Sequence, residues 1–346
     1  MLVIMDRMRV TMIDVAKTAG VSVATVDRVL NRRAPVRQST AERILTAARE
    51  LQYYASPLLK AQIQQMQMPI RCAILLQRRT TAFYQALASA LRRSSRNRPE
   101  IGADLVIEYA DAVNSTAVAN RIRALTSQVD AIAVVALDHP QISHAIADAA
   151  ESGVRTVALV SDLSSEQKYD YVGINNRSAG RTAAWFLSRL AKKPGTIGIV
   201  TGSHRYLCQE SREAGFRSYF REEASRFRLS ETVVCLDDPA IAYDAAREFL
   251  ETHPDCVGLY NAGGGEFGTS QALTELAQRH HIIFICHELA NSRDALISGT
   301  ADLVIDQNPD LLAERCVNAL IASRDPNTSK IRSEAVPFAI YTSENI

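Results

Sequence analysis

The fold of this chain is decided by residues 11–31, which read TMIDVAKTAGVSVATVDRVLN. Thr11 and Asp14 have the spacing of a capping box, in which a hydroxyl and a carboxylate satisfy the free N–H groups at the start of a helix. Gly20 ends this first helix, and Ser22 caps a second one after a turn over residues 19–21. Two short helices joined by a glycine-containing turn predict a helix-turn-helix, the arrangement that reads DNA.

The second helix, expected over residues 22–30, has two distinct faces. Three apolar side chains at i, i+3 and i+4 are expected to pack inward, namely Val26, Val29 and Leu30. The opposite face carries Ala24, Asp27, Arg28 and Asn31. On this face Arg28 could pair with guanine, while Val23 and Ala24 offer methyl contact to thymine. The residues expected to contact DNA are Thr11, Ser22, Val23, Ala24, Thr25, Arg28 and Asn31.

A third helix and the charge distribution favour a DNA-binding head over two packed helices of an ordinary helical protein. The sequence STAE at residues 39–42 has capping-box spacing and opens a helix whose apolar side holds Ile44, Ala47, Ala48 and Leu51. The first 60 residues contain ten Lys or Arg and five Asp or Glu, a net charge of +5 in a chain of net charge +1. A basic N-terminal module on a mildly acidic body is typical of a nucleic-acid-binding arm.

Four motifs of this head, TMIDVA, AGVS, TVDRVLN and AARELQY, resemble the DNA-binding head of the lactose-repressor (LacI/GalR) family of bacterial transcription regulators. The resemblance covers the head at residue level and the rest of the chain only as an architectural pattern. It implies a two-lobed α/β body similar to periplasmic sugar-binding proteins, in which a small carbohydrate effector is held between the lobes. It further implies a homodimer, most simply a repressor, that binds a pseudo-palindromic double-stranded operator.

The remainder of the 346-residue chain is too long for one core and suits two α/β lobes. Short β-rich runs alternate with helix-length segments, which is the pattern of parallel sheets flanked by helices. Strands are expected at residues 72–76, 105–109, 131–135, 156–160, 197–201, 256–260 and 282–286, with a further strand-like run at 303–305.

These patterns divide the chain into three expected parts. The DNA-binding domain spans residues 1–56, the hinge 57–69, and the effector-binding and dimerisation domain 70–346. Within the last part, the first lobe is expected at about 70–192 and 304–324, and the second at about 193–303 and 325–346. The chain would then cross between lobes near 190–195, 300–305 and 323–330.

Composition argues against a membrane protein and against a metal site. Apolar runs fall well short of the ~20 residues of a membrane span, and the charged start of the chain lacks a secretory apolar region. We therefore expect a cytoplasmic protein. The six cysteines are scattered without a CxxC or Cys/His cluster, which favours reduced buried thiols over disulfides or zinc. Neither a metal nor a cofactor is expected.

Polar and aromatic residues follow the expected strands, where parallel sheets bind their ligands. Loops are also polar simply because they lie at the surface, and that alternative stays open. The residues expected at one cleft are Phe83, Tyr84, Asp138, Asp162, Asn175, Arg212, Asn261, His287, Glu288 and Gln307. Carboxylates, amides and a guanidinium group satisfy sugar hydroxyls, and aromatic rings cover the C–H side of a sugar.

The resemblance assigns roles to individual positions in this set. REAGF at residues 212–216 matches the family's Arg-x-x-Gly-aromatic helix, which implies that Arg212 reaches the ligand. YVGINNRSAG implies an Asn pointing into the pocket, a role that falls to Asn175. Asn261 matches a family Asn before the next helix. The Asp usual at the following strand end is replaced here, so its role stays open between His287 and Glu288.

A rival signal lies in the same region. GGGEFG at residues 263–268 satisfies G-x-G-x-x-G after an expected strand, and Glu288 follows about 20 residues later, as in a dinucleotide-binding fingerprint. An NAD(P)-dependent oxidoreductase is therefore one alternative function. The competing interpretation is a glycine-rich turn in a ligand-binding lobe, which the preceding DNA-binding head favours. A sugar-binding module without a DNA role is a further alternative. A catalytic role has no positive support, since GxSxG is absent.

The segment after the head departs from the family pattern. A family hinge helix contains Pro, is rich in Ala and Leu, and wedges a Leu into the minor groove. Residues 55–69 read ASPLLKAQIQQMQMP, which puts Gln62 at the position of that Leu. Leu58, Leu59 or Ile63 could take its place if the register slips.

Overall fold

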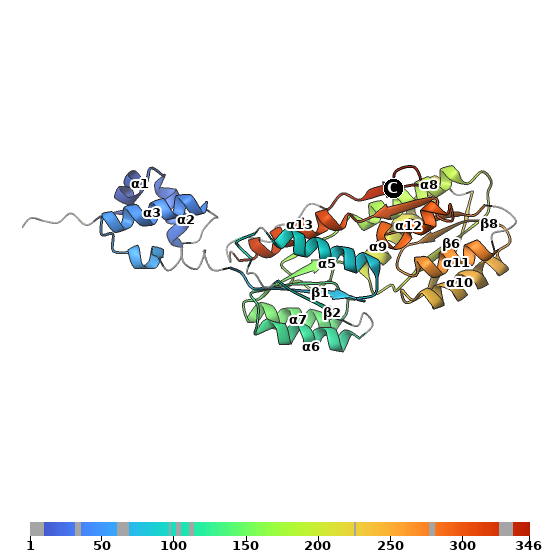
Figure 1. The fold of residues 1–346 in the computed structure, drawn as a ribbon, viewed down its shortest axis with the longest axis horizontal. Coiled ribbons are helices and arrows are strands. Elements are labelled where there is room, and N and C mark those ends of the chain that lie inside the picture. Colours follow the sequence, from blue (N-terminus) through green and yellow to red (C-terminus); the bar gives the residue numbers. More distant parts are fainter. Residues whose placement is uncertain are drawn as a thin grey trace, which may run out of the picture.

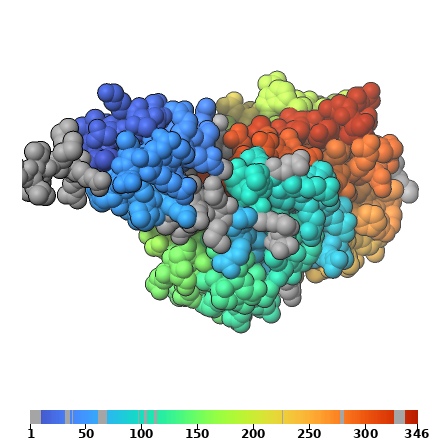
Figure 2. Space-filling view, turned by 60° about the vertical axis from the view of Figure 1, so that its left-hand side comes forward, coloured from blue at the N-terminus to red at the C-terminus, as the bar shows by residue number. Residues whose placement is uncertain are grey.

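The computed structural model describes residues 10–31, 36–60, 69–96, 98–101, 105–110, 114–224, 226–276, 281–324 and 335–346. These residues form a small helical head and an α/β body with two sheets (Figure 1). The head, in blue, is a separate unit in the ribbon view (Figure 1), and the space-filling view shows its outer surface (Figure 2). The expected fold class is therefore confirmed.

The first two helices of the head begin and end where the sequence predicts. Helix α1 spans Met12–Ala19 and α2 spans Val23–Asn31. The Asp14 carboxylate accepts from the Thr11 N–H at 2.9 Å, and the Thr11 hydroxyl accepts from the Asp14 N–H at 3.4 Å, so the capping box is present. Gly20 has φ of 63°, as a helix C-cap requires. The Ser22 hydroxyl accepts from the Thr25 N–H at 3.2 Å at the start of α2.

The third helix, α3 (Gln38–Glu50), closes the core of the head. Its Arg43 donates to the carbonyl groups of Ala19 and Gly20 at 2.6 and 3.1 Å and so ties α3 to the end of α1. The expected capping box at Ser39 is wrong, because α3 begins at Gln38 without a side-chain cap and Ser39 already lies in its first turn. The expected inward faces are confirmed by the buried side chains of Val26, Val29, Leu30, Ile44, Ala47 and Ala48, while Leu51 is partly buried.

The first lobe contains a parallel five-stranded sheet in the order β2-β1-β3-β4-β5. Its strands are β1 (Cys72–Gln77), β2 (Val106–Ala110), β3 (Ala131–Val134), β4 (Arg155–Leu159) and β5 (Asp170–Val172). Helices α5 (Ala82–Ser95) and α13 (Pro309–Ala322) cover one face, and α6 (Ser115–Thr126) and α7 (Pro140–Glu151) cover the other (Figure 1). Alternate residues of β1 therefore enter two different apolar clusters.

The second lobe contains six strands in the order β11-β10-β9-β8-β6-β7, of which only β11 is antiparallel to its neighbour. They are β6 (Thr196–Thr201), β7 (Arg228–Val234), β8 (Cys256–Asn261), β9 (Ile283–His287), β10 (Leu303–Asp306) and β11 (Ala339–Tyr341). Helices α8 (Asn176–Leu190) and α9 (Leu207–Glu223) pack on one face. The other face carries α10 (Pro239–Thr252), α11 (Glu266–Leu276) and α12 (Leu289–Ile297).

All eight strand-like runs form strands within one residue of the expected bounds, but three strands were not expected. Strand β7 is a half-exposed edge with polar residues, and β5 and β11 span only three residues each, so none carries a strong apolar pattern. The pattern of apolar residues along the sequence therefore predicts the buried strands but not the short or half-exposed strands.

The expected lobe boundaries are wrong at two crossings. Helix α8 packs on α9 in the second lobe, so the chain first crosses at residues 173–175 and not at 190–195. Strand β10 pairs with β9 and β11, which moves the second crossing from 300–305 to 307–308. A helix cannot show in its own sequence which sheet it will cover. The third crossing lies between α13 and β11, and residues 325–334 of it lie outside the described part of the chain.

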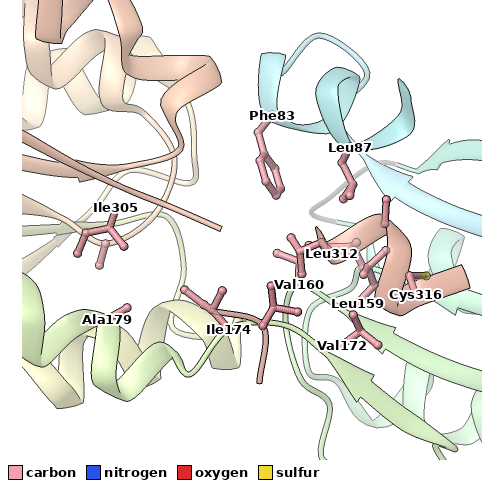
Figure 3. Packing of buried hydrophobic residues seen from close by; sticks show 14 of the residues in the cluster. Phe83, Leu87, Leu159, Val160, Val172, Ile174, Ala179, Ile305, Leu312 and Cys316 are labelled. Atoms are coloured by element: carbon pink, nitrogen blue, oxygen red, sulfur yellow. The ribbon is translucent and has the colours of Figure 1, made fainter. Parts of the chain in front are cut away.

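The apolar core continues through the junction between the lobes. Figure 3 shows Phe83 and Leu87 of α5 above Leu312 of α13, with Val160 and Ile174 continuing toward Ala179 and Ile305 of the second lobe. The crossing segments also run side by side, because the Val336 N–H donates to the Gly173 carbonyl at 2.9 Å. The lobes thus meet through apolar packing and paired backbone.

The start of the expected hinge is an extension of the head. Residues 56–60 are helical, and Leu59 is fully buried in the core of the head. Leu59 is therefore not free to enter a minor groove, whereas Leu58 is 53% exposed. Gln62 and Ile63 lie outside the described residues.

Candidate ligand cleft and nucleic-acid interface

A cleft of about 420 Å³ lies between the two sheets, at the carboxyl ends of their strands. This is where open parallel sheets bind small molecules. The first lobe contributes the end of β1, the start of α5 and the loop after β4, through Gln77, Phe83, Tyr84 and Ser161. The second lobe contributes α9 and the loops after β7, β8, β9 and β10, through Gln209, Arg212, Asp237, Glu266, Glu288 and Gln307.

The two lobes hold each other directly across this cleft. The Tyr206 hydroxyl at the start of α9 donates to the Gln77 side-chain carbonyl. Arg78 Nη2 donates to the Leu236 carbonyl at 2.7 Å, and the Phe83 N–H donates to Asn291 Oδ1 at 2.9 Å. Each of these bonds joins a residue of the first lobe to a residue of the second lobe. The two lobes are therefore closed on each other across the cleft.

Arg212 is fixed at the centre of the cleft by two hydrogen bonds. The residue is 3% exposed, its Nε donates to Asn176 Oδ1 at 2.8 Å, and its Nη1 donates to the Ala262 carbonyl at 3.0 Å. Nη2 is buried, has no hydrogen-bond partner among the described residues, and lies 3.8 Å from Glu288 Oε1. The guanidinium group is thus oriented by the protein and keeps one donor group unused.

Glu288 and Gln307 form a second polar pair beside Arg212. Gln307 Nε2 donates to Glu288 Oε1 at 2.6 Å, while Glu288 Oε2 and Gln307 Oε1 have no hydrogen-bond partner in the described part of the chain. Burial raises the pKa of Glu288 to about 8, although Arg212 opposes this shift. Glu288 has φ of 66°, a left-handed conformation that a non-glycine residue adopts only under constraint.

Two more carboxyl groups, Glu266 and Asp237, face the cleft from the second lobe. Glu266 Oε1 accepts from Asn291 Nδ2 at 3.2 Å, and burial raises the pKa of Glu266 to about 7. Asp237 Oδ1 accepts from the Gly264 N–H at 2.6 Å and from Gln209 Nε2 at 3.1 Å. One wall of the cleft is therefore acidic.

The glycine-rich loop at residues 263–265 has a structural explanation. Its N–H groups are used within the protein, because Gly263 donates to Asn261 Oδ1 at 3.1 Å and Gly264 donates to Asp237. A Cβ at Gly263 would lie 2.5 Å from Gln209 Oε1, and Gly265 has φ of 84°. The glycines leave room for the side chains of Gln209 and Asp237 to lie against the loop. Asp237 and Glu266 also put negative charge where a dinucleotide would need to place its diphosphate. These contacts argue against the dinucleotide-binding alternative.

Five of the ten expected ligand residues line the cleft, namely Phe83, Tyr84, Arg212, Glu288 and Gln307. Of His287 and Glu288, between which the sequence left the role open, only Glu288 lines the cleft. His287 is fully buried and bonds the Tyr260 hydroxyl at 2.8 Å, and burial holds its pKa well below the usual value. Neighbouring residues at a strand end point in opposite directions, so only one of the pair can face the cleft.

The other four expected residues do not line the cleft but have local structural roles. Asp138 accepts from the Ser164 N–H at 2.9 Å, and Asp162 pairs with Lys168 at 2.7 Å. Asn175 is exposed and caps α8 by accepting from the Ser178 N–H at 3.0 Å. Asn261 shapes the glycine-rich loop. The residue after Asn175 is the one that turns inward: the Asn176 side chain accepts a hydrogen bond from Arg212.

Several cleft residues were not expected from the sequence: Gln77, Arg78, Tyr206, Gln209, Asp237, Glu266 and Asn291. Gln77 ends β1, so the rule that selected the other residues could have found it. Gln209 lies three positions before Arg212 and therefore shares its helix face. Asp237 follows β7, the edge strand that the sequence did not predict.

The outer face of α2 provides the candidate nucleic-acid interface. Ser22, Val23, Ala24, Arg28 and Asn31 are exposed, and Thr25 is partly exposed. The Asn31 amide donates to Asp27 Oδ1 at 2.6 Å, which holds it against the helix. Thr11 is exposed at the start of α1, where its hydroxyl is engaged with Asp14. The face therefore presents two methyl-bearing side chains beside a guanidinium group.

The described residues contain neither a membrane-spanning helix nor a metal-binding cluster. No helix in this part of the chain is both long and apolar enough to span a bilayer. Likewise, no group of three or more His, Cys, Asp or Glu side chains in it is arranged to hold a metal ion.

Two family models match the chain. The model described as bacterial regulatory proteins, lacI family, matches residues 11–56, and the model described as periplasmic binding protein domain matches residues 73–324. Among curated proteins, none matches.

Solved structures resemble the α/β body at low sequence identity. An ABC transporter solute-binding protein from Burkholderia graminis, in complex with D-arabinose, has a TM-score of 0.73 at 18% identity over 81% of this chain and 97% of that one. One from Agrobacterium vitis, bound with alpha-D-tagatopyranose, has a TM-score of 0.73 at 20% identity over 80% and 95%. GanP, a glucose-galactose binding protein from Geobacillus stearothermophilus, has a TM-score of 0.72 at 16% identity over 81% and 99%. At these identities the likeness establishes the fold.

Proposed function

Because the chain belongs to the lacI family of bacterial regulatory proteins and carries a periplasmic binding protein domain, we propose that it is a sugar-responsive transcriptional repressor. Its head binds a pseudo-palindromic operator as part of a homodimer, and a small sugar or sugar-like effector in the cleft between the lobes sets the affinity for DNA. The protein acts in the cytoplasm, where bacterial DNA is found.

The observation that carries this proposal is the group of four buried polar atoms without partners among the described residues at the cleft: Arg78 Nε, Arg212 Nη2, Glu288 Oε2 and Gln307 Oε1. Leaving a buried polar group unsatisfied typically costs about 1–3 kcal/mol, so four in one place indicate a ligand that pairs with them. Two N–H donors, an amide oxygen and a carboxyl group suit adjacent hydroxyl groups, and the rings of Phe83 and Tyr84 suit the C–H side of a sugar. The three neighbouring folds described above were solved or named as binders of monosaccharides.

Closure of the lobes provides the link to DNA. A ligand bound to Arg212 in the second lobe and to Tyr84 in the first favours the closed arrangement over open ones. In a dimer, a change in the lobe arrangement alters the spacing of the two heads, and an operator accepts only a spacing that matches its half-sites. Effector and operator affinities therefore become linked.

A thermal-shift screen of mono- and disaccharides tests the effector part, because a ligand that binds only the folded state raises the melting temperature. We expect at least one sugar to stabilise the wild type and not a Glu288→Gln variant. An Arg181→Lys variant, at a position of α8 that does not line the cleft and pairs with Glu222 of α9 at 2.8 Å, serves as the control and should respond like the wild type.

Selection of bound fragments from bacterial genomic DNA tests the operator part. We expect enrichment of a two-half-site sequence, and the stabilising sugar should change its affinity. A head that binds none of the fragments, in a protein that a sugar still stabilises, would favour the alternative of a sugar-binding module without a DNA role.

A further inference from the structure

We propose that the cleft accepts an effector without negative charge, a free sugar or polyol, and excludes the phosphate ester of the same compound. This inference rests on the proposed function, since it concerns the chemical class of the effector. It depends on two features of the cleft: the balance of its charged side chains and the occupation of its backbone N–H groups.

Acidic side chains outnumber basic ones around the cleft. Asp237, Glu266 and Glu288 line it from the segments that follow three different strands, β7, β8 and β9, and all three belong to the second lobe. Two guanidinium groups oppose them. Arg212 donates to Asn176 and Ala262, and Arg78, at the edge of the first lobe, donates its Nη2 to the Leu236 carbonyl, so each has one N–H group, Arg212 Nη2 and Arg78 Nε, left without a partner among the described residues. With all groups ionised, the lining therefore carries one negative charge in excess.

At three helix starts around the cleft, one backbone N–H group is already paired with one of the protein's own oxygen atoms. Helix N-termini attract phosphate because their N–H groups are unpaired. At α5, the Phe83 N–H donates to Asn291 Oδ1 at 2.9 Å. Before α11, the Gly264 N–H donates to Asp237 at 2.6 Å, and at α12 the Leu289 N–H donates to Asp306 Oδ1 at 3.0 Å. At each of these three positions a phosphate group would have to displace one side chain, and two of the three side chains, Asp237 and Asp306, are carboxylates.

The protonation of the acidic wall makes the exclusion depend on pH. Glu266 faces Asp237, Arg212 and Asn291, while Glu288 faces Arg212, Gln307 and Asp306. Burial raises the pKa of Glu266 to about 7 and that of Glu288 to about 8. Above pH 8 Glu266 and Glu288 are both ionised and repel an anion most strongly, whereas near pH 6 both hold protons. A neutral sugar has no charge to repel at either pH.

Matched pairs of compounds test the proposal by isothermal titration calorimetry at pH 6.0 and 8.5. The probes are glucose, galactose, arabinose, ribose and fructose, each with its available 1-, 5- or 6-phosphate ester. We expect one or more free sugars to bind, and the ester of each bound sugar to bind at least 100-fold more weakly at pH 8.5. The ratio should shrink at pH 6.0. The double variant Asp237→Asn, Glu266→Gln should reduce the ratio to below 10-fold at pH 8.5.

The outcomes separate this inference from the function on which it rests. A phosphate ester that binds the wild type as tightly as its free sugar, or more tightly, overturns the charge selection and leaves a sugar-responsive regulator intact. Failure of every free sugar and every ester to bind overturns the proposed effector class together with this inference. The wild-type ratios decide the matter by themselves if the double variant does not fold.

Discussion

Replacement of Glu266 by Gln should remove a pH-dependent loss of stability from the second lobe. Glu266 is 6% exposed at the start of α11, and burial raises its pKa from the ordinary 4.5 to about 7. The folded state therefore holds a proton that the unfolded chain has released between these two pH values. Stability falls as the pH rises above 4.5, and the loss is complete above pH 7.

The size of the effect follows from the two pKa values. At about 1.4 kcal/mol per pKa unit, the full loss amounts to about 3 kcal/mol, of which about 2 kcal/mol develops between pH 5.5 and 8.5. Glu266→Gln does not titrate, and its amide carbonyl can still accept the Asn291 Nδ2 hydrogen bond. The variant should therefore lose about 2 kcal/mol less than the wild type between these pH values.

Urea denaturation followed by circular dichroism at pH 5.5 and 8.5 measures both free energies of unfolding. Glu248→Gln, which replaces an exposed carboxylate on α10, is the matched control and should follow the wild type. Equal losses in the wild type and in Glu266→Gln would refute the reasoning, because they would mean that Glu266 is ionised in the folded state at a pKa close to its ordinary value.

Three further substitutions test the head, the helix packing and the cleft. Arg28→Ala should weaken operator binding by about 1–3 kcal/mol and hardly affect random DNA in anisotropy titrations; equal losses on both would assign Arg28 to phosphate contact. Gly180→Ala should destabilise the body by about 1–3 kcal/mol in thermal melts, because its Cβ would lie 1.9 Å from the Arg212 carbonyl oxygen; an unchanged melting temperature would argue against this close helix contact. Arg212→Lys should abolish the effector response yet preserve the affinity for operator DNA, since a point charge cannot bond Asn176 and Ala262 and also reach a ligand; a normal effector midpoint would show that the ligand binds elsewhere.

The head could be predicted closely because its signals are local. Thr11, Gly20 and Ser22 act within one turn of the helix ends they define, and the buried stripe of α2 follows from helical spacing alone. The failure at Ser39 has a local cause too. A capping motif marks a helix start only if no earlier residue already begins the helix, and here Gln38 does.

The body could be predicted as a class but not in its connections. Buried strands can be recognised in the sequence as apolar runs. The position of the cleft at their carboxyl ends could therefore be predicted, and so could the presence of Arg212 and Glu288 in its lining. Which lobe α8 joins depends on its close contact with α9, where Gly180 meets Arg212 and Gly215 meets Arg177. Such contacts, between residues 32 and 38 positions apart, cannot be predicted from the sequence of the helix alone.

Neighbouring polar residues were the hardest to assign. Asn175 and Asn176 differ only in which side of the first turn of α8 they occupy, and the shift of one residue decides between a helix cap and a partner of Arg212. Asp237 was missed for a different reason. It follows β7, whose polar edge gave no strand signal, so no rule placed it at a strand end.

The central claim, that a ligand between the lobes controls DNA binding by the head, is tested most directly by titrating the stabilising sugar into the protein with and without operator DNA. Allosteric coupling of about 1–3 kcal/mol is typical, which corresponds to a change of about 5- to 150-fold in the dissociation constant for the sugar. Reciprocity requires that saturating sugar change the dissociation constant for the operator by the same factor. We expect equal factors well above one in the two titrations, and identical sugar dissociation constants with and without operator would contradict the account.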